Sequence, residues 1–243
     1  MSYLCERSFE EAKEIISKNP QIICAVSAPE PIHNLALNTN EFITEKIAER
    51  VSQESGIFLT SPVLQGIITP FKPIAALGTH HRRFSSLISD CVRFLCAGGI
   101  KKVFFITSCD FFSRYIDEGI NNYKKKLPDD FSHEIICWQN TKTADETIKA
   151  QFENPIEFFR KESAIFLLAN ELKGVEIPKF LPKLPFSKDD FVKWKKRGCD
   201  PEKLRKLSPN FQFSSWTDFT PPRYSFFEKI CGEISTKILQ NKL

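Results

Sequence analysis

The stretch QIICAVSAPEPIHNLALNTNEFITEKIAERV, residues 21–51, consists of an apolar run, a polar loop and an amphipathic segment. The run QIICAV (Gln21–Val26) is continuous and rich in β-branched residues, which is typical of a strand covered on both faces of a parallel sheet. The last part repeats apolar residues at helical spacing and predicts a helix from Thr39 or Asn40 to about residue 54. Its predicted inner stripe is Phe42, Ile43, Ile47 and Val51. The stretch therefore predicts one strand, loop and helix of an α/β fold.

The same alternation continues along the chain. Ser8 followed by Glu11 is a capping box that predicts the start of a first helix. Further predicted strands are residues 57–60 (IFLT), 103–107 (VFFIT), 133–139 (HEIICWQ) and 164–169 (AIFLLA), and further predicted helices are residues 84–97, 112–126 and 225–239. Strands that alternate with helices form right-handed units around a parallel sheet. We expect a three-layer α/β/α domain with a mainly parallel sheet.

The length and composition fit one folded domain. The chain has 243 residues, of which 42% are hydrophobic, enough to bury a core. We predict a single domain over residues 1–243, with an irregular, ordered excursion or oligomer contact at about residues 178–222, where Pro, Lys and Phe are frequent. The chain has 9 glycines where average usage of about 7% gives roughly 17, which argues against a glycine-rich catalytic loop.

Charge and hydropathy patterning limit the class of partner and the compartment. The net charge of +4 is small and scattered, so we expect no nucleic-acid partner. No run of about 18 apolar residues is present, so we expect no membrane span. Glu6, Glu10 and Glu11 interrupt any apolar run at the N-terminus, so we expect no signal peptide, and the eight dispersed cysteines form no C-x-x-C pair. We expect a cytoplasmic protein with reduced thiols.

Several segments recur, in the same order, in one family of enzymes. The loop after the first strand contains Leu35, Leu37 and Thr39, which fit the motif L-P-L-G-T, and ITEKIAERV (residues 43–51) is close to the helix that follows it. Further matches are Gly66, Gly78-Thr79 in a P-G-T motif, GGIKKVFFIT (residues 98–107) and Glu162-Ser163 in an E-T-S-x-x-L segment. In these segments the chain resembles the creatininase family of metal-dependent amidohydrolases, except over about residues 178–210. The resemblance implies a creatininase-like α/β fold and a hexamer.

The catalytic motifs of that family are altered. Its members bind two divalent ions, which need carboxylates and imidazoles from separate loops. In an ungapped alignment the positions of the metal ligands are degenerate: the family's Glu, two His and Asp fall on Pro29, Pro31, Asn34 and Asn40, and the ligands of a later loop fall on Cys109 and Phe111. Proline cannot ligate a metal, and Asn is a weaker ligand than Asp. We therefore expect no cofactor and a pseudoenzyme: a non-catalytic subunit or binding protein, assembled with itself, for example as a hexamer, or with an active paralogue.

Other readings of the same residues remain open. A one-residue shift places Glu30 on the family's Glu, so Glu30, His33, Cys109, Asp110 and Glu162 are the ligand candidates of an alternative zinc or manganese site. The chain would then be a divergent amidohydrolase of a cyclic amide, formamide or similar C–N bond. Alternatively, the chain is a ligand-binding module that uses the pocket of the altered metal site, lined by Asn34, Asn40, Phe111 and Phe112.

Two further groups of residues are candidate functional sites. The run Thr79-His80-His81-Arg82-Arg83 precedes a predicted helix and is either an anion site or a solvated helix start. Cys109 with His33 or His81 could form a nucleophilic pair, although nothing in the spacing requires it.

Overall fold

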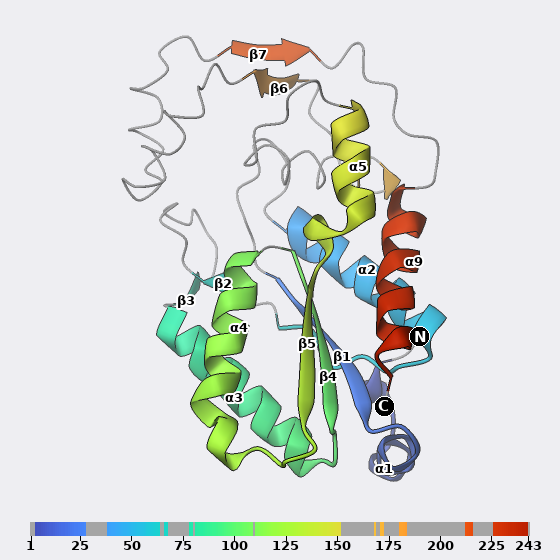
Figure 1. Ribbon diagram of the computed structural model, residues 1–243, viewed down its shortest axis with the longest axis vertical. Helices are drawn as coiled ribbons and strands as arrows, with labels where there is room; N and C mark the ends of the chain where they lie inside the picture. The colour runs from blue at the N-terminus through green and yellow to red at the C-terminus, as the bar shows by residue number, and fades with distance from the viewer. Residues whose placement is uncertain are drawn as a thin grey trace.

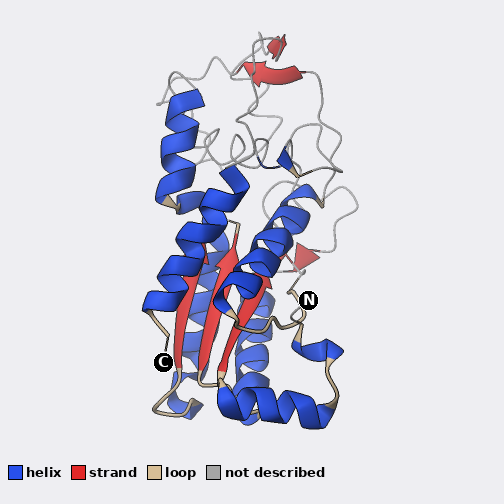
Figure 2. Cartoon of the chain, turned by 90° about the vertical axis from the view of Figure 1, so that its right-hand side faces the viewer, coloured by secondary structure: helices blue, strands red, loops and turns tan. Residues whose placement is uncertain are grey.

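The computed structural model describes residues 3–27, 38–63, 66–67, 78–79, 81–108, 110–151, 168, 171–172, 180–183, 212–215 and 226–242. Within these ranges the fold is built on a parallel sheet of β1 (Gln21–Val26), β4 (Lys102–Thr107) and β5 (Ser132–Cys137), in the order β1-β4-β5. Gln21 lies opposite Lys102, and Lys102 lies opposite Ser132. Figure 2 shows the three strands side by side, with their carboxyl ends pointing the same way.

Helices cover both faces of this sheet. α3 (His81–Ala97) and α4 (Asp110–Tyr123) lie on one face, and α2 (Thr39–Ser55) and α9 (Phe226–Gln240) lie on the other (Figure 1). Alternate residues of β4 serve the two cores, because side chains of a strand point to opposite faces. Phe104 and Ile106 pack with α2 and α9, and Val103 and Phe105 pack with α3 and α4. The predicted three-layer α/β/α fold with a mainly parallel sheet is confirmed.

The short elements complete the described chain. They are η1 (Leu4–Glu6), α1 (Phe9–Lys18), β2 (Gly66–Ile67), β3 (Gly78–Thr79), η2 (Lys124–Lys126), η3 (Trp138–Asn140), α5 (Lys142–Gln151), β6 (Phe180–Lys183) and β7 (Gln212–Ser215). The capping box of α1 forms as predicted: the Glu11 N–H donates to Ser8 Oγ, and the Ser8 N–H donates to Glu11 Oε2 at 2.9 Å. No described helix is both long and apolar enough to cross a membrane.

α3 and α4 make a close helix contact. A Cβ on Gly119 of α4 would lie 2.5 Å from the carbonyl oxygen of Ser85 in α3. The Ser89 hydroxyl of α3 also donates to the Gly119 carbonyl oxygen at 2.6 Å. The absence of a side chain at Gly119 therefore lets the two backbones approach and fixes α4 beside α3.

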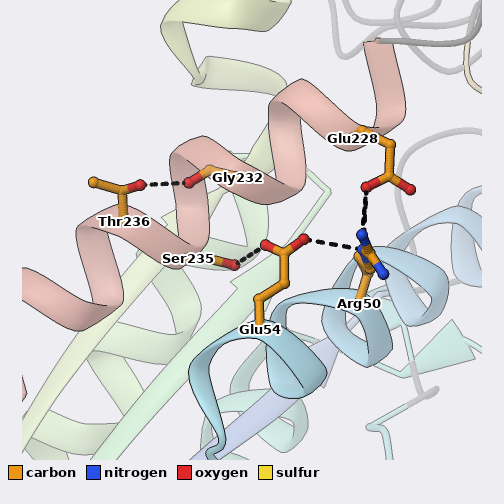
Figure 3. A network of polar contacts seen from close by, with 6 residues as sticks. All are labelled: Arg50, Glu54, Glu228, Gly232, Ser235 and Thr236. Atoms are coloured by element: carbon orange, nitrogen blue, oxygen red, sulfur yellow. Dashed lines mark hydrogen bonds and ion pairs between the residues drawn. The ribbon is translucent and has the colours of Figure 1, made fainter.

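α9 is held on α2 by apolar packing and by a polar network. Ile230, Ile234 and Ile238 of α9 are buried in the core that α2 also forms. At the rim, Arg50 of α2 lies 2.9 Å from Glu228 and 3.0 Å from Glu54, and Ser235 Oγ donates to Glu54 Oε2 at 2.7 Å (Figure 3). Because Arg50 and Glu228 are partly exposed, this pair stabilises the contact weakly, and the isoleucines supply most of the free energy.

Three predicted strands differ from the structure. Residues 57–60 form only isolated bridges, in which Leu59 pairs in parallel with Ile23 and Tyr3. The strand predicted to reach residue 139 ends at Cys137 and continues as η3. The strand prediction for residues 164–169 is wrong at Leu168, which is helical and accepts a hydrogen bond from the Leu172 N–H at 2.8 Å.

The excursion at residues 178–222 is described only in β6 and β7, which pair antiparallel with Phe180 opposite Ser215. The rest of that region lies outside the described residues. The single-domain boundary of 1–243 stays a prediction.

Candidate functional site

Polar side chains gather where the parallel strands end. Thr107 and Ser108 stand at the end of β4, Gln139 follows β5, and Thr39 and Asn40 open α2; all are buried. In open parallel sheets, ligands bind at the carboxyl ends of the strands. Thr44 bonds to Asn40, and Trp138 bonds to Thr44. We call these seven residues the carboxyl-edge cluster.

Asn40 is the centre of this cluster. Its side chain is fully buried, and its Nδ2 donates to Ser108 Oγ at 2.9 Å. This bond joins the start of α2 to the residue after β4, across 68 positions of sequence. The carboxamide therefore presents an N–H group, not an oxygen, to the end of β4.

A second chain of bonds ties β5 to the same point. Trp138 Nε1 donates to Thr44 Oγ1 at 3.0 Å, and Thr44 Oγ1 donates to the Asn40 carbonyl oxygen at 2.8 Å. Trp138 and Thr44 are both completely buried. Because buried polar groups need partners, these bonds fix the relative positions of β4, β5 and α2 with neutral groups.

Two other atoms of the cluster make no such bonds. Thr107 Oγ1 and Gln139 Oε1 are buried, and neither has a hydrogen-bond partner within the described part of the chain. An unpaired buried polar atom destabilises a fold by about 1–3 kcal/mol. These two oxygens lie at the ends of adjacent strands, because Thr107 is opposite Cys137 at the end of β5.

The described side chains do not fit a two-metal centre. No group of three or more His, Cys, Asp or Glu that could hold a metal ion occurs among the residues that the structure describes. The side chains that meet at the carboxyl edge are carboxamides and hydroxyls, which bind divalent ions more weakly than carboxylates do. Asn40 in particular is already bonded to Ser108 through its nitrogen.

The other predicted site residues divide into two groups. Asp110 and Phe111 begin α4, directly at the carboxyl end of β4. The remainder lie outside the described residues: Pro29, Glu30, Pro31, His33, Asn34, His80, Cys109 and Glu162. The structure therefore places Asn40 and the backbone of residues 110–111 at one edge of the sheet.

One predicted role changes in the structure. Phe112 does not line a pocket: it is 1% exposed and packs against Phe84 in the core between α3 and α4. His81 is the first residue of α3, and its ring lies 5.2 Å from that of Tyr115 in α4. Arg82 and Arg83 are exposed, as expected of a solvated helix start.

The described cysteines are free thiols. Burial raises the pKa of the Cys24 thiol in β1 to about 12, an effect that a hydrogen bond with Thr60 partly offsets. Burial also raises the pKa of Cys91 above its ordinary value. Because the thiolate is the reactive form, both thiols are poor nucleophiles, and Cys24 acts as a small apolar side chain of the core.

Sequence reasoning missed Ser108, Thr107 and Gln139 as members of the cluster. One signal was present, since each follows or ends a predicted buried strand. Their contacts with α2, however, depend on how the layers pack, which no local pattern encodes.

The comparisons with known proteins concern the whole chain. No family model matches it, and no curated protein matches it in sequence. Among solved structures, a manganese creatininase matches with a TM-score of 0.75 and 13% sequence identity, over 99% of this chain and 98% of that chain. This chain has a creatininase-like fold.

Two further creatininase structures agree. A creatinine amidohydrolase (creatininase) matches with a TM-score of 0.69 and 12% identity, over 99% of this chain and 98% of that chain. A mutant creatininase of the Zn-Zn type matches with a TM-score of 0.69 and 13% identity, over 98% of this chain and 95% of that chain. The predicted resemblance to creatininase is confirmed for the fold, and at this identity the match shows the fold alone.

Proposed function

We propose that this creatininase-fold protein is a pseudoenzyme: a non-catalytic subunit or binding protein whose two-metal centre has been lost. The observation that carries the proposal is the buried Asn40 to Ser108 hydrogen bond at 2.9 Å. The sequence resemblance places a metal-binding carboxylate of the family at Asn40. In this protein that position carries a neutral side chain that is used to connect α2 with β4.

The residue type at position 40 also disfavours metal binding. The Asn40 carboxamide can offer a divalent ion only a neutral oxygen, which is a weaker ligand than the carboxylate that the resemblance places there.

The partner in this proposal is another folded chain: a second copy, in a homo-oligomer such as a hexamer, or an active paralogue. Two large aromatic side chains support an apolar contact, since Phe9 is 71% exposed and Phe94 is 69% exposed. Exposed aromatic residues are enriched in protein interfaces. Sedimentation showing only a monomer at micromolar concentration would count against self-association.

One observation favours the alternative, a divergent amidohydrolase with a rebuilt zinc or manganese site. α4 begins at Asp110, two residues after Ser108, so Asp110 lies at the same edge as Asn40. Glu30, His33, Cys109, Asp110 and Glu162 are the ligand candidates of that alternative, which would hydrolyse a cyclic amide, formamide or similar C–N bond.

Metal analysis separates the two. The protein is purified without chelator, its zinc and manganese are measured by inductively coupled plasma mass spectrometry, and hydrolysis of creatinine and formamide is assayed with each metal added. We expect no stoichiometric metal and no hydrolysis. Two ions per chain together with turnover would overturn the pseudoenzyme proposal, because a two-metal centre supplies the activated water of such reactions.

A further inference from the structure

A groove of about 390 Å³ lies beside the carboxyl-terminal half of β5, where Ile135, Ile136 and Cys137 line it. Ser113 and Asp117 of α4 form one wall, and Glu233, Ile234 and Lys237 of α9 form the other. Figure 1 shows β5 between these two helices. Because its walls come from both faces of the sheet, the groove surrounds the edge itself.

The backbone of β5 faces this groove. The Ser132 N–H donates to the Lys101 carbonyl oxygen, so residues 132, 134 and 136 direct their N–H and C=O groups toward β4. Successive residues of a strand point these groups to opposite sides, and His133 and Ile135 therefore direct theirs away from β4. Among the described strands, none pairs with β5 on that side. An edge of this kind is a template for an added strand.

The charges in the groove favour a basic ligand. The Lys237 ammonium group is paired with Glu134 at 2.8 Å. Glu233 is also engaged, since its two oxygens accept the N–H groups of Lys142 and Thr143 at 2.8 Å. Asp117 is the accessible carboxylate of the lining: its side chain is 55% exposed, and its one ion-pair partner in the described chain is His133.

We propose that this groove binds an extended segment of a partner protein, which adds to β5 as an extra strand and carries a lysine or arginine opposite Asp117. Its backbone would pair with His133 and Ile135. Its alternate side chains would reach the two walls. Cationic side chains would lie near Asp117, and apolar side chains would contact Ile136 and Ile234. This proposal is independent of the pseudoenzyme proposal, since no residue of it belongs to the carboxyl-edge cluster.

The occupant that we infer is a single segment and not the sheet edge of a second copy. Paired strands approach to about 4.8 Å, and side chains of α4 and α9 line the groove on both sides of β5. A segment with no folded layer of its own can lie between these two walls without bringing further helices against them.

The first test is peptide binding, with a fluorescein-labelled heptapeptide of alternating lysine and valine as the probe. This peptide presents lysines to one wall and valines to the other. We expect saturable binding, which weakens about tenfold or more when glutamate replaces lysine, because like charges then meet at Asp117. A third peptide, N-methylated at alternate backbone nitrogens, should not bind. Equal binding of the three peptides, or no saturable binding of the lysine peptide, would refute the proposal.

Matched variants locate the site. Asp117→Lys should weaken binding of the lysine peptide about tenfold or more. Asp90→Lys makes the same change at a carboxylate of similar exposure on α3, 59% against 55%, and should leave binding unchanged. If the two variants behave alike, the attraction is nonspecific and the groove is not the site.

Hydrogen exchange measured by NMR tests the strand geometry. The Ile135 amide should become protected when the peptide binds, whereas the Ile136 amide, which already points to β4, should change little. Ile135→Pro removes an outward N–H, which an edge strand tolerates, and also a partly buried side chain that packs on the core between α3 and α4. It should abolish binding while circular dichroism stays unchanged. If instead the unliganded protein is a dimer that Ile135→Pro dissociates, the occupant is a second copy and the proposal is wrong.

Discussion

The sheet has two edges of opposite character. At the carboxyl edge, Asn40, Ser108, Thr44 and Trp138 bond to one another and are fully buried. At the side edge, β5 lies beside an open groove with a half-exposed carboxylate, Asp117. Both edges offer polar groups, but those of the first are largely used to hold the protein together. The carboxyl edge thus contributes to the stability of the fold, whereas the side edge stays accessible.

Removing the indole that anchors the carboxyl edge should have the largest effect. Trp138→Ala deletes a side chain with no solvent exposure and the donor to Thr44 Oγ1. We expect a loss of about 3–5 kcal/mol in the free energy of unfolding, measured by urea denaturation. Trp138→Phe, which keeps an aromatic ring, is the control and should lose less. A loss below about 1 kcal/mol for Trp138→Ala would mean that this edge is not closely packed.

The Asn40 to Ser108 bond should have the next largest effect. Ser108→Ala leaves the buried carboxamide nitrogen of Asn40 without this partner, so we expect a loss of about 1–3 kcal/mol. Asn40→Ala should lose about 0.5–2 kcal/mol. Because the two side chains share one bond, the double variant should lose less than the sum. Strict additivity in the same urea experiment would show that the bond does not couple α2 to β4.

On the groove side, Glu233→Gln should give a smaller and pH-dependent effect. Burial alone would raise the pKa of Glu233, but the N–H groups of Thr143 and Lys142 lower it below its ordinary value of 4.5. A lowered pKa in the folded state stabilises the protein above the unfolded-state pKa, and this stability is lost as the pH falls through the folded value.

The stability of the wild type should therefore exceed that of Glu233→Gln by about 0.5–1.5 kcal/mol near neutral pH, and the difference should shrink as the pH falls through the lowered pKa of Glu233. Melting curves of both proteins over this pH range are the measurement. A difference that stays constant with pH would show that the charge of Glu233 does not matter to the start of α5.

The smallest expected effect is that of a chelator. If the carboxyl edge holds no metal, EDTA should shift the melting temperature of the wild type by no more than about 1 °C, well under 1 kcal/mol. A fall of about 5 °C or more that zinc or manganese restores would show that the carboxyl edge also binds a ligand. Glu30, His33, Cys109 and Asp110 would then be the candidate metal ligands.

The strands that the sequence identified correctly are those with an unambiguous environment. β1 and β4 are short apolar runs that are buried on both faces. Residues 57–60 lie at the edge of the sheet beside Pro62, which lacks an N–H, and form only a bridge at Leu59. The run at residues 164–169 was misassigned at Leu168, because a short apolar run fits a buried helix as well as a strand.

The candidate site, like the strands, could be predicted from the sequence only in part. Sequence pointed to the carboxyl ends of the strands and to Asn40 as an altered ligand position, and the structure buries Asn40 at that edge. It did not indicate Ser108 as the partner of Asn40, or Trp138 as the anchor of Thr44. These pairs are 68 and 94 residues apart.

By itself, then, the sequence indicated most of the order of strands and helices, the capped start of α1 and the creatininase resemblance, and it predicted that the ligands of that family are replaced. Each of these depends on residues that are close together in the sequence and form a periodic pattern, a helix cap or a motif. The tertiary structure alone decided that Asn40 bonds to Ser108 and that Asp117 and Glu233 line one groove at the edge of β5. Those contacts join residues from distant elements, and only the packing of the layers against the sheet brings them together.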